Sequence, residues 1–339
     1  MTDRSAAIDM FLENAGWQGA TRSPLAGDAS NRRYERIAGP QSKAVLMDAP
    51  SAKGEDVRPF VRITNLLRSQ GLSAPEVMAA DVENGFLLLE DLGDDLFARV
   101  VAADETTETP LYEAATDVLI SLHSVEVPED IAPYSPAFMA EMAALAWRWY
   151  LRGAEVADED KANLFQNRFE QLLQQHAPIC DVLIQRDYHA ENLLWLPDRE
   201  GVARVGLLDY QDAMAGHRAY DLVSLLQDAR RDVPQTTEHR MIAHYVEHSD
   251  VDKQEFLAAY HVLGAQRNLR ILGVFARLCM HFGKAHYVDF IPRVWGYLLR
   301  DLAHPVLEPI HDVVLQDLPA PSSDILNRLK EKCATIPTL

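Results

Sequence analysis

Apolar and polar residues alternate with different periods in two parts of the chain. Up to about residue 92, short apolar runs and period-two alternation are typical of β-strands. They predict strands at about 34–37, 44–48, 76–78 and 86–90. Apolar residues three or four positions apart predict a short helix that ends at Gly16 and another over about 57–69. This part is therefore expected to form a small sheet with an inserted helix.

Beyond residue 92 the helical period of apolar residues dominates. It predicts helices over about 110–123, 137–152, 159–175, 219–230, 236–248, 252–280 and 290–303. The exception is an apolar hairpin formed by 193–196 and 202–208. A β-rich part followed by an α-rich part indicates an α+β protein with two lobes, a small N-terminal lobe over 1–92 and a larger, helical C-terminal lobe over 93–339. The cleft between two lobes is the usual place for a ligand.

Composition and charge narrow the range of functions. The chain of 339 residues carries 32 basic and 51 acidic residues, a formal net charge of -19. Such a chain suits neither nucleic acid nor an anionic membrane, because both attract clustered Lys and Arg. Three widely spaced cysteines, no signal-peptide pattern and no apolar run of about 20 residues predict a cytoplasmic protein without a disulfide framework. We expect a small-molecule partner and infer no obligate protein partner.

The segment Gln185–Asn192 has the spacing of a phosphoryl-transfer site. Asp187 is followed five residues later by Asn192, and Asp209 follows after the apolar hairpin. In kinases the first Asp of such a pattern receives the substrate's hydroxyl proton, and the Asn and the second Asp bind Mg²⁺. Antiparallel pairing brings the two ends of the hairpin side by side, so Asn192 and Asp209 would offer two oxygen ligands together. Each residue alone could be a turn residue, whereas their order and spacing favour a kinase.

These motifs resemble those of the aminoglycoside phosphotransferase superfamily, which shares the protein-kinase fold. Gln185-Arg186-Asp187 corresponds to the His-Arg-Asp of kinases, and Asp209-Tyr210-Gln211 to their Asp-Phe-Gly. The resemblance implies a two-lobed protein-kinase-like fold, ATP as the phosphoryl donor and Mg²⁺ as the metal. It also implies that Asp221, in Tyr220-Asp221-Leu222, braces the catalytic loop.

A narrower resemblance is to bacterial sugar kinases of cell-wall recycling, which phosphorylate the anomeric hydroxyl of N-acetylmuramate and N-acetylglucosamine. The segments that carry it are 45–50, 85–93, 185–196 and 209–213. It makes Asp187 the catalytic base and makes Asn192 and Asp209 the Mg²⁺ ligands. The candidate substrate-binding residues are His189, Glu191 and Asp212. In the alternative interpretation, the histidine braces the backbone and the two carboxylates are solvated.

The nucleotide is expected to bind the first lobe. A polar loop before the first predicted strand could cover phosphate groups with backbone N–H groups, although a plain turn is the alternative. The candidate nucleotide-binding residues of this loop are Gly27, Ser30, Asn31 and Arg32. Glu90 and Leu92 lie in the connection between the lobes, where members of the family bind adenine through backbone groups.

One position departs from the kinase pattern. Kinases carry on the third strand a Lys that binds the phosphates and pairs with a helix Glu. Met47 and Asp48 stand there, and the helix that follows contains no Glu. Arg32 is our candidate for the missing cation, and Arg33 and Lys43 are the alternatives.

Two further groups have both a structural and a functional interpretation. Trp147, Trp149 and Tyr150 could form a wall for a sugar ring, although core packing is commoner for such a stripe. Arg267 and Arg270 could bind a lactyl carboxylate or pair with acidic residues. We expect an ATP-dependent kinase of an N-acetylated amino sugar. The alternatives are a kinase of an aminoglycoside, choline or another sugar, and a non-catalytic nucleotide-binding module.

Overall fold

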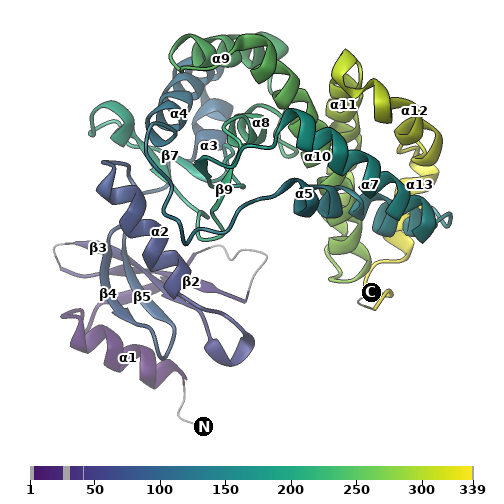
Figure 1. The fold of residues 1–339 in the computed structure, drawn as a ribbon. Helices are drawn as coiled ribbons and strands as arrows, with labels where there is room; N and C mark the ends of the chain where they lie inside the picture. The colour runs from purple at the N-terminus through teal and green to yellow at the C-terminus, as the bar shows by residue number, and fades with distance from the viewer. Residues whose placement is uncertain (1–3, 26–30, 41, 338–339) are drawn as a thin grey trace. The chain divides into compact units, whose positions relative to one another are not determined.

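The computed structural model divides into two compact units. It describes residues 4–25, 31–40 and 42–337. Unit 1 comprises Met1–Val118 and Ala190–Ala213, and unit 2 comprises Leu119–His189 and Met214–Leu339. Unit 1 contains an antiparallel sheet, and unit 2 is almost entirely helical (Figure 1). The α+β organisation expected from the sequence is confirmed, and the lobe boundary between residues 92 and 93 stays a prediction.

Unit 1 is built on a five-stranded antiparallel sheet with the order β1-β2-β3-β5-β4. The strands are β1 Thr21–Pro24, β2 Arg33–Ala38, β3 Lys43–Asp48, β4 Val77–Asp81 and β5 Phe86–Glu90. Helix α1 (Arg4–Asn14) lies across one face of the sheet, and α2 (Arg58–Ser69) lies on the other side (Figure 1). The small sheet with an inserted helix is confirmed. The sequence pattern misses β1, because Thr-Arg-Ser-Pro offers no apolar alternation.

The core of unit 1 forms where α1 meets the sheet. The buried residues that pack there include Ile8, Phe11, Leu12, Ala44, Leu46, Phe86 and Leu88. Successive side chains of a strand point to opposite faces, so Asp48 shares the α1 face with Leu46. Arg4 of α1 forms an ion pair with Asp48 on that face. Met47 consequently points to the face away from α1.

A two-stranded hairpin completes unit 1. β7 (Leu193–Trp195) pairs antiparallel with β8 (Val205–Leu207). The Leu207 N–H donates to the Ser73 carbonyl oxygen at 3.0 Å, which attaches the hairpin to the segment before β4. The other helices that begin in this unit are α3 Phe97–Ala103 and α4 Glu108–Leu122.

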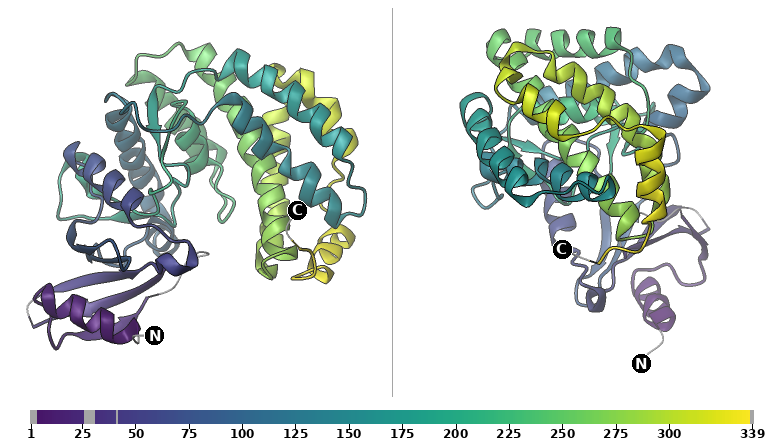
Figure 2. Two further views of the ribbon diagram at one scale, coloured as in Figure 1. Left: turned by 60° about the horizontal axis from the view of Figure 1, so that its bottom comes forward. Right: turned by 90° about the vertical axis from the view of Figure 1, so that its right-hand side faces the viewer.

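Unit 2 is organised around α10 (Lys253–Met280), a helix of 28 residues whose side chains are mostly buried. Helices α5, α7 and α11 lie beside it (Figure 2). The remaining helices are α5 Pro136–Ala143, α6 Leu151–Gly153, α7 Glu159–His176, α8 Tyr220–Leu226, α9 Gln235–Glu247, α11 Ile291–Leu302, α12 Glu308–Asp317 and α13 Ser323–Glu331. β6 (Val182–Ile184) pairs antiparallel with β9 (Met214–Gly216).

The predicted helix over 137–152 is wrong in its continuity. α5 ends at Ala143, and Ala146–Tyr150 form a π-type turn before α6. Trp147 in this turn is buried and stacks on Phe165, with ring centroids 3.9 Å apart. The aromatic stripe therefore packs the core of unit 2, as the structural interpretation predicts. The sequence pattern also misses α3, α12 and α13, and β6 and β9 are too short to show a period.

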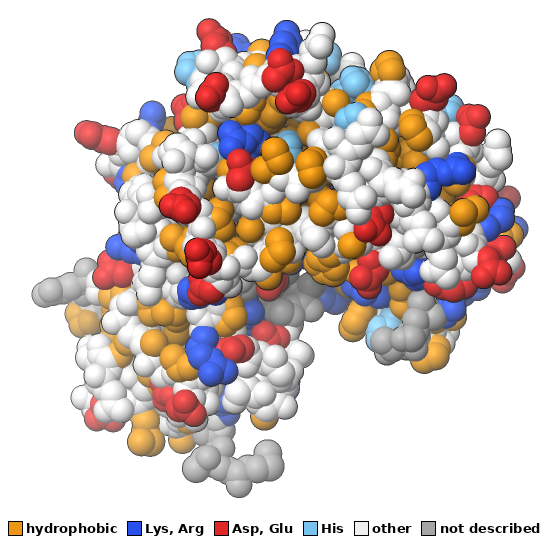
Figure 3. Space-filling view, viewed as in Figure 1, with side chains coloured by type: hydrophobic (Ala, Val, Ile, Leu, Met, Phe, Trp, Pro, Cys, Tyr) orange, Lys and Arg blue, Asp and Glu red, His pale blue; other side chains and the backbone are white. Residues whose placement is uncertain are grey.

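Basic and acidic side chains are mixed on one face of the molecule. On the face shown in Figure 3, Lys and Arg side chains are interspersed with Asp and Glu. None of the described helices combines the length and apolar composition needed to cross a bilayer.

Candidate active site

The loop that follows β6 is held by one buried carboxylate. Asp221, in the first turn of α8, accepts hydrogen bonds from the N–H groups of Gln185 at 2.6 Å and Arg186 at 2.9 Å. Arg186 has a φ of 72°, a left-handed conformation that costs a non-glycine residue on the order of 1 kcal/mol. The two bonds hold the backbone in this conformation immediately before Asp187. The brace expected at Asp221 is confirmed.

Burial changes the acidity of this brace. It raises the pKa of Asp221 to about 7, and the two backbone N–H donors oppose the rise because they stabilise the carboxylate. Gly216 of β9 lets the neighbouring strand come close, since a Cβ there would lie 2.5 Å from the Ile184 side chain. The end of β6, from which the loop starts, is therefore fixed on two sides.

Asp187 lies half-buried beside two arginines of α10. Burial alone would raise the pKa of Asp187, but the positive charges of Arg270 and Arg267 outweigh burial and lower it. The carboxylate stays ionised at neutral pH and can accept a proton from a hydroxyl group. Of the two partners predicted for these arginines, a lactyl carboxylate or an acidic residue, the structure shows an acidic residue, Asp187. Their spacing of three residues on one predicted helix is the signal that could have shown their common direction.

Arg267 also supports the loop backbone. The residue is 3% exposed, and its guanidinium donates to the Ser224 hydroxyl at 2.6 Å. That hydroxyl donates in turn to the carbonyl oxygen of Arg186 at 3.3 Å. The peptide groups before Asp187 are thus held by Asp221 through their N–H groups and by Ser224 through a carbonyl group.

His189 is a buried, neutral side chain. The Arg230 guanidinium lies 3.0 Å from His189 Nε2. Arginine has only donors, so Nε2 accepts and the proton of the imidazole is on Nδ1. Burial and the charge of Arg230 lower the pKa of His189 to about 3. This geometry favours the bracing interpretation of His189, and its role in substrate binding stays a prediction.

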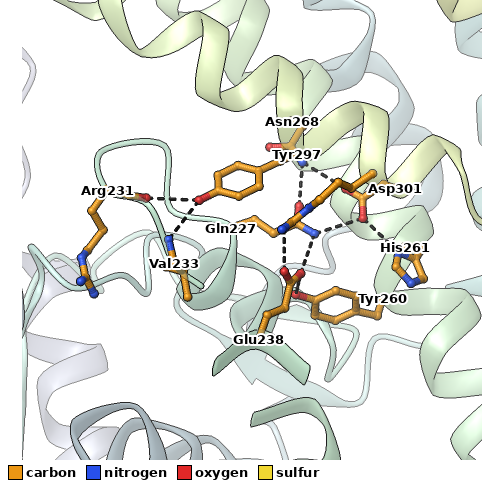
Figure 4. Close-up of polar contacts among 10 residues, drawn as sticks. Gln227, Arg231, Val233, Glu238, Tyr260, His261, Asn268, Tyr297 and Asp301 are labelled. Carbon is orange, nitrogen blue, oxygen red and sulfur yellow. Dashed lines mark hydrogen bonds and ion pairs between the residues drawn. The ribbon is translucent and has the colours of Figure 1, made fainter. Parts of the chain in front are cut away.

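A second polar network fixes the helices behind the loop (Figure 4). The Gln227 side chain, just after α8, donates to Asp301 of α11 at 3.0 Å and accepts from Asn268 of α10 at 2.7 Å. Glu238 of α9 accepts from Gln227 and from the Tyr260 hydroxyl. Asn268 directly follows Arg267, so the network sets the rotation of α10 that directs Arg267 toward Ser224.

The hairpin of unit 1 brings Asn192 and Asp209 together. Asn192 precedes β7, and its carbonyl oxygen accepts the N–H of Leu208 at 2.9 Å. Asp209 is the next residue, so the predicted pairing of the two hairpin ends is confirmed. Asp187 belongs to unit 2, five residues before Asn192 along the chain. Its action together with the pair stays a prediction.

The pair offers the ligands that Mg²⁺ prefers. Asp209 has a φ of 59°, and its carboxylate accepts the Gln211 amide at 2.8 Å, which fixes its orientation. Within the described residues, no three or more His, Cys, Asp or Glu side chains cluster as a metal site. One carboxylate and one amide nevertheless fit Mg²⁺ in a kinase, because phosphate oxygens and water complete its shell.

Tyr210 connects the hairpin end to α2. The buried ring stacks on Phe60, with centroids 5.2 Å apart, and its hydroxyl shares a hydrogen bond of 2.7 Å with Thr64. Both partners belong to α2, the helix that carries no acidic residue. The segment that contains Asp209 is therefore anchored on α2.

The predicted nucleotide-binding residues are only partly described. Gly27 and Ser30 lie outside the described residues. The Asn31 N–H donates to Glu55 at 3.2 Å, and the Arg32 side chain donates to the same carboxylate at 3.0 Å. Glu55 is not among the residues predicted from the sequence.

In the connection after β5, the Glu90 N–H donates to the Glu76 carbonyl oxygen at 2.9 Å, and its carboxylate pairs with Arg199. The backbone donor of Glu90 is thus engaged. This makes Leu92 the better candidate for a backbone contact with adenine, which stays a prediction.

The position of the usual kinase lysine is filled by a buried methionine. Met47 is fully buried, and Asp48 faces α1 with Arg4. The alternative cations Arg33 and Lys43, each the first residue of its strand, are exposed.

The two candidate sugar-binding carboxylates, Glu191 and Asp212, have exposed side chains. Both belong to unit 1. Their contact with a substrate stays a prediction.

Comparisons with known proteins identify the family. The model of the family described as "Phosphotransferase enzyme family" matches residues 21–261. The chain belongs to this family. Among curated relatives, the N-acetylmuramate/N-acetylglucosamine kinase of Caulobacter vibrioides is 38% identical, covering 90% of this chain and 94% of the relative. The protein of the same name from Pseudomonas aeruginosa is 34% identical, covering 81% and 82%.

Solved structures confirm the kinase-like fold of this phosphotransferase family member. Choline kinase LicA from Streptococcus pneumoniae matches with a TM-score of 0.59 and 13% identity, covering 88% of this chain and 100% of that chain. The ADP-bound aminoglycoside phosphotransferase APH(2'')-Ib matches with a TM-score of 0.56 and 12% identity, covering 86% and 94%. Family membership favours an ATP-dependent kinase over a non-catalytic module.

Proposed function

We propose that the protein transfers the γ-phosphoryl group of ATP to the anomeric C1 hydroxyl of N-acetylmuramate or N-acetylglucosamine. The observation that carries this proposal is the similarity over most of the chain to relatives named as kinases of these two sugars. The ionised Asp187 on its braced loop supports the chemistry. We place the reaction in the cytoplasm, because ATP is its phosphoryl donor.

In the proposed reaction, Asp187 accepts a hydrogen bond from the C1 hydroxyl and orients its oxygen toward the γ-phosphorus. The new bond joins the C1 oxygen to phosphorus, the bond from phosphorus to the ADP oxygen breaks, and Asp187 takes the hydroxyl proton. When bound at Asn192 and Asp209, Mg²⁺ offsets the charge of the phosphate oxygens. Arg270 and Arg267 keep Asp187 ionised before the transfer.

The remaining candidate residues divide between the two substrates. The acceptor sugar would contact His189, Glu191 and Asp212. The nucleotide would contact the loop of Gly27, Ser30, Asn31 and Arg32 through its phosphates, and Glu90 or Leu92 through adenine.

A substrate panel tests the acceptor. Mg²⁺-dependent ATP consumption is measured with N-acetylmuramate, N-acetylglucosamine, choline and an aminoglycoside, and the product is analysed by phosphorus NMR. We expect turnover with the two N-acetylated sugars and an acid-labile product whose phosphorus couples to H1. Preference for choline or an aminoglycoside, or coupling to another sugar proton, would reject the proposed acceptor.

A further inference from the structure

We propose that the ion pair of Arg32 and Glu55 performs the task of the strand Lys and helix Glu of kinases. Arg32 binds the phosphates of the nucleotide, and Glu55 acts as a positioning residue that holds Arg32 and joins it to α2. The inference deepens the proposed function and rests on ATP as the donor. All residues that carry it belong to unit 1.

The candidate cation lies immediately before the neighbouring strand, β2, rather than on β3. Tyr34 of β2 pairs directly with Met47 of β3, so the two side chains share the face away from α1. Arg32 precedes Tyr34 by two residues and forms a side-chain hydrogen bond with it. Residues two apart on an extended chain lie on one face. Arg32 thus approaches the face on which a lysine at position 47 would stand.

The acidic partner, Glu55, lies in the segment before α2 rather than within the helix. Glu55 lies three residues before α2, directly after Gly54, whose φ of 83° turns the chain. One carboxylate oxygen accepts Arg32 Nε at 3.0 Å, and the other accepts the Asn31 N–H at 3.2 Å. Glu55 therefore holds both the backbone and the side chain of the residues that lead into β2.

The pair is shielded from water, unlike the ion pair next to it. The side chains of Arg32 and Glu55 are 13% and 14% exposed, whereas those of Arg58 and Asp56 are 75% and 44% exposed. Electrostatic interactions are screened less when they are partly buried. A guanidinium has five N–H donors in a planar fork, so it can hold a carboxylate through Nε and also bind phosphate oxygens.

Helix α2, which follows Glu55 in the chain, contacts the residue next to a proposed metal ligand. The chain passes from Glu55 to the start of α2 within three residues, and the Thr64 hydroxyl of α2 shares a hydrogen bond of 2.7 Å with the Tyr210 hydroxyl. Tyr210 directly follows Asp209. A kinase Lys–Glu pair likewise joins phosphate binding to the position of a helix.

Nucleotide binding tests the pair without depending on turnover. The affinities of the Glu55→Gln variant for MgADP and for adenosine are measured by isothermal titration calorimetry. Glu55→Gln weakens the charge-assisted hydrogen bond that holds Arg32. We therefore expect MgADP to bind about 10-fold more weakly, while adenosine binds as before. The matched control is Asp56→Asn, which removes the neighbouring exposed carboxylate and should change neither affinity. Equal effects of the two variants, or an equal loss for adenosine, would overturn the proposal.

A double-mutant cycle tests whether Glu55 acts through Arg32. Arg32→Ala should weaken MgADP binding by about 100-fold, and adding Glu55→Gln should weaken it no further. Additive losses would show that Glu55 acts independently of Arg32 and would reject its role as a positioning residue. Because adenosine and MgADP binding need no acceptor, a chain that phosphorylates none of the proposed sugars could still show this pattern. Failure of the acceptor and failure of the ion pair are therefore distinguishable.

Discussion

The loop Gln185–Asn192 keeps the residue pattern of kinases, whereas β3 and α2 depart from it. The loop keeps the Asp and the Asn at the family's spacing, and Asp221 and Ser224 hold its backbone in a strained conformation. Strand β3 instead carries Met47 where kinases have Lys, and α2 has no Glu. The chain therefore keeps one half of the kinase residue pattern and departs from the other half.

The difference follows from how far each functional atom can move. A base must lie within about 3 Å of the hydroxyl oxygen whose proton it takes, and a misplacement of about 1 Å can cost 100-fold in rate. Asp187 has a short side chain, so its position is the position of the backbone. An arginine reaches phosphate oxygens at the end of a long side chain, so it can start from another strand. The loop is constrained by backbone geometry, whereas the cation is constrained only by reach and charge.

Of the substitutions that probe this difference, replacing the proposed base Asp187 should have the largest effect on kcat. Asp187→Ala should lower kcat by about 1000-fold, because general-base catalysis and orientation of the hydroxyl are lost together. MgADP affinity should stay nearly unchanged, since all proposed nucleotide ligands belong to unit 1. Steady-state kinetics and calorimetry measure the two quantities. Asp181→Ala, which removes an exposed carboxylate paired with Arg218, serves as the control. Normal turnover of Asp187→Ala would contradict the mechanism.

The loop could be predicted from the sequence because the residues that define it are close together in the chain. The five-residue spacing and the apolar hairpin suffice to place Asn192 beside Asp209, and the resemblance supplies the brace Asp221. Arg267 and Arg270 were harder to predict, since they come from α10, more than 75 residues away. Only the tertiary packing of α10 shows that both act on Asp187.

Weakening the hydrogen bonds of Asp221 to the loop should have an intermediate effect on kcat. In Asp221→Asn one acceptor oxygen becomes an NH₂ group that faces a backbone N–H, so one of the two bonds to Gln185 and Arg186 is lost. The strained Arg186 backbone can then relax and move Asp187. We expect kcat to fall by about 100-fold while the protein still folds. Full activity of this variant would show that the loop keeps its shape without the brace.

The same variant tests the titration of Asp221. Its folded pKa of about 7 lies above the ordinary Asp value of 3.8, so the folded state binds more protons between these values. The stability that this group contributes is therefore present at low pH and is lost as pH rises toward about 7. The free energy of unfolding of the wild type minus that of Asp221→Asn should fall over this range, measured by urea unfolding at several pH values. A difference that is constant with pH would contradict this assignment.

The part of the site around β3 and α2 could be predicted from the sequence only incompletely. The missing lysine is visible from Met47 alone, and Arg32 is a reasonable candidate from its place before β2. Glu55 could not be identified from the sequence pattern, because it does not belong to a predicted helix and stands next to another acidic residue, Asp56. Only the structure distinguishes the two carboxylates, through their exposure and their partners. A motif identifies residues at fixed spacing, whereas a relocated pair needs three-dimensional contacts.

The smallest expected effect concerns the contact, within unit 1, between α2 and the segment that contains Asp209. Tyr210→Phe keeps the ring that stacks on Phe60 and removes the hydroxyl bonded to Thr64. The free energy of unfolding should fall by about 1 kcal/mol, because the buried Thr64 hydroxyl loses its partner. Urea unfolding measures the change. The double variant Tyr210→Phe with Thr64→Val should lose no more than Tyr210→Phe alone, since removing both partners leaves no unsatisfied polar group. If the losses simply add, the hydrogen bond does not couple α2 to the Asp209 segment, and only the packing of Tyr210 on Phe60 would anchor that segment on α2.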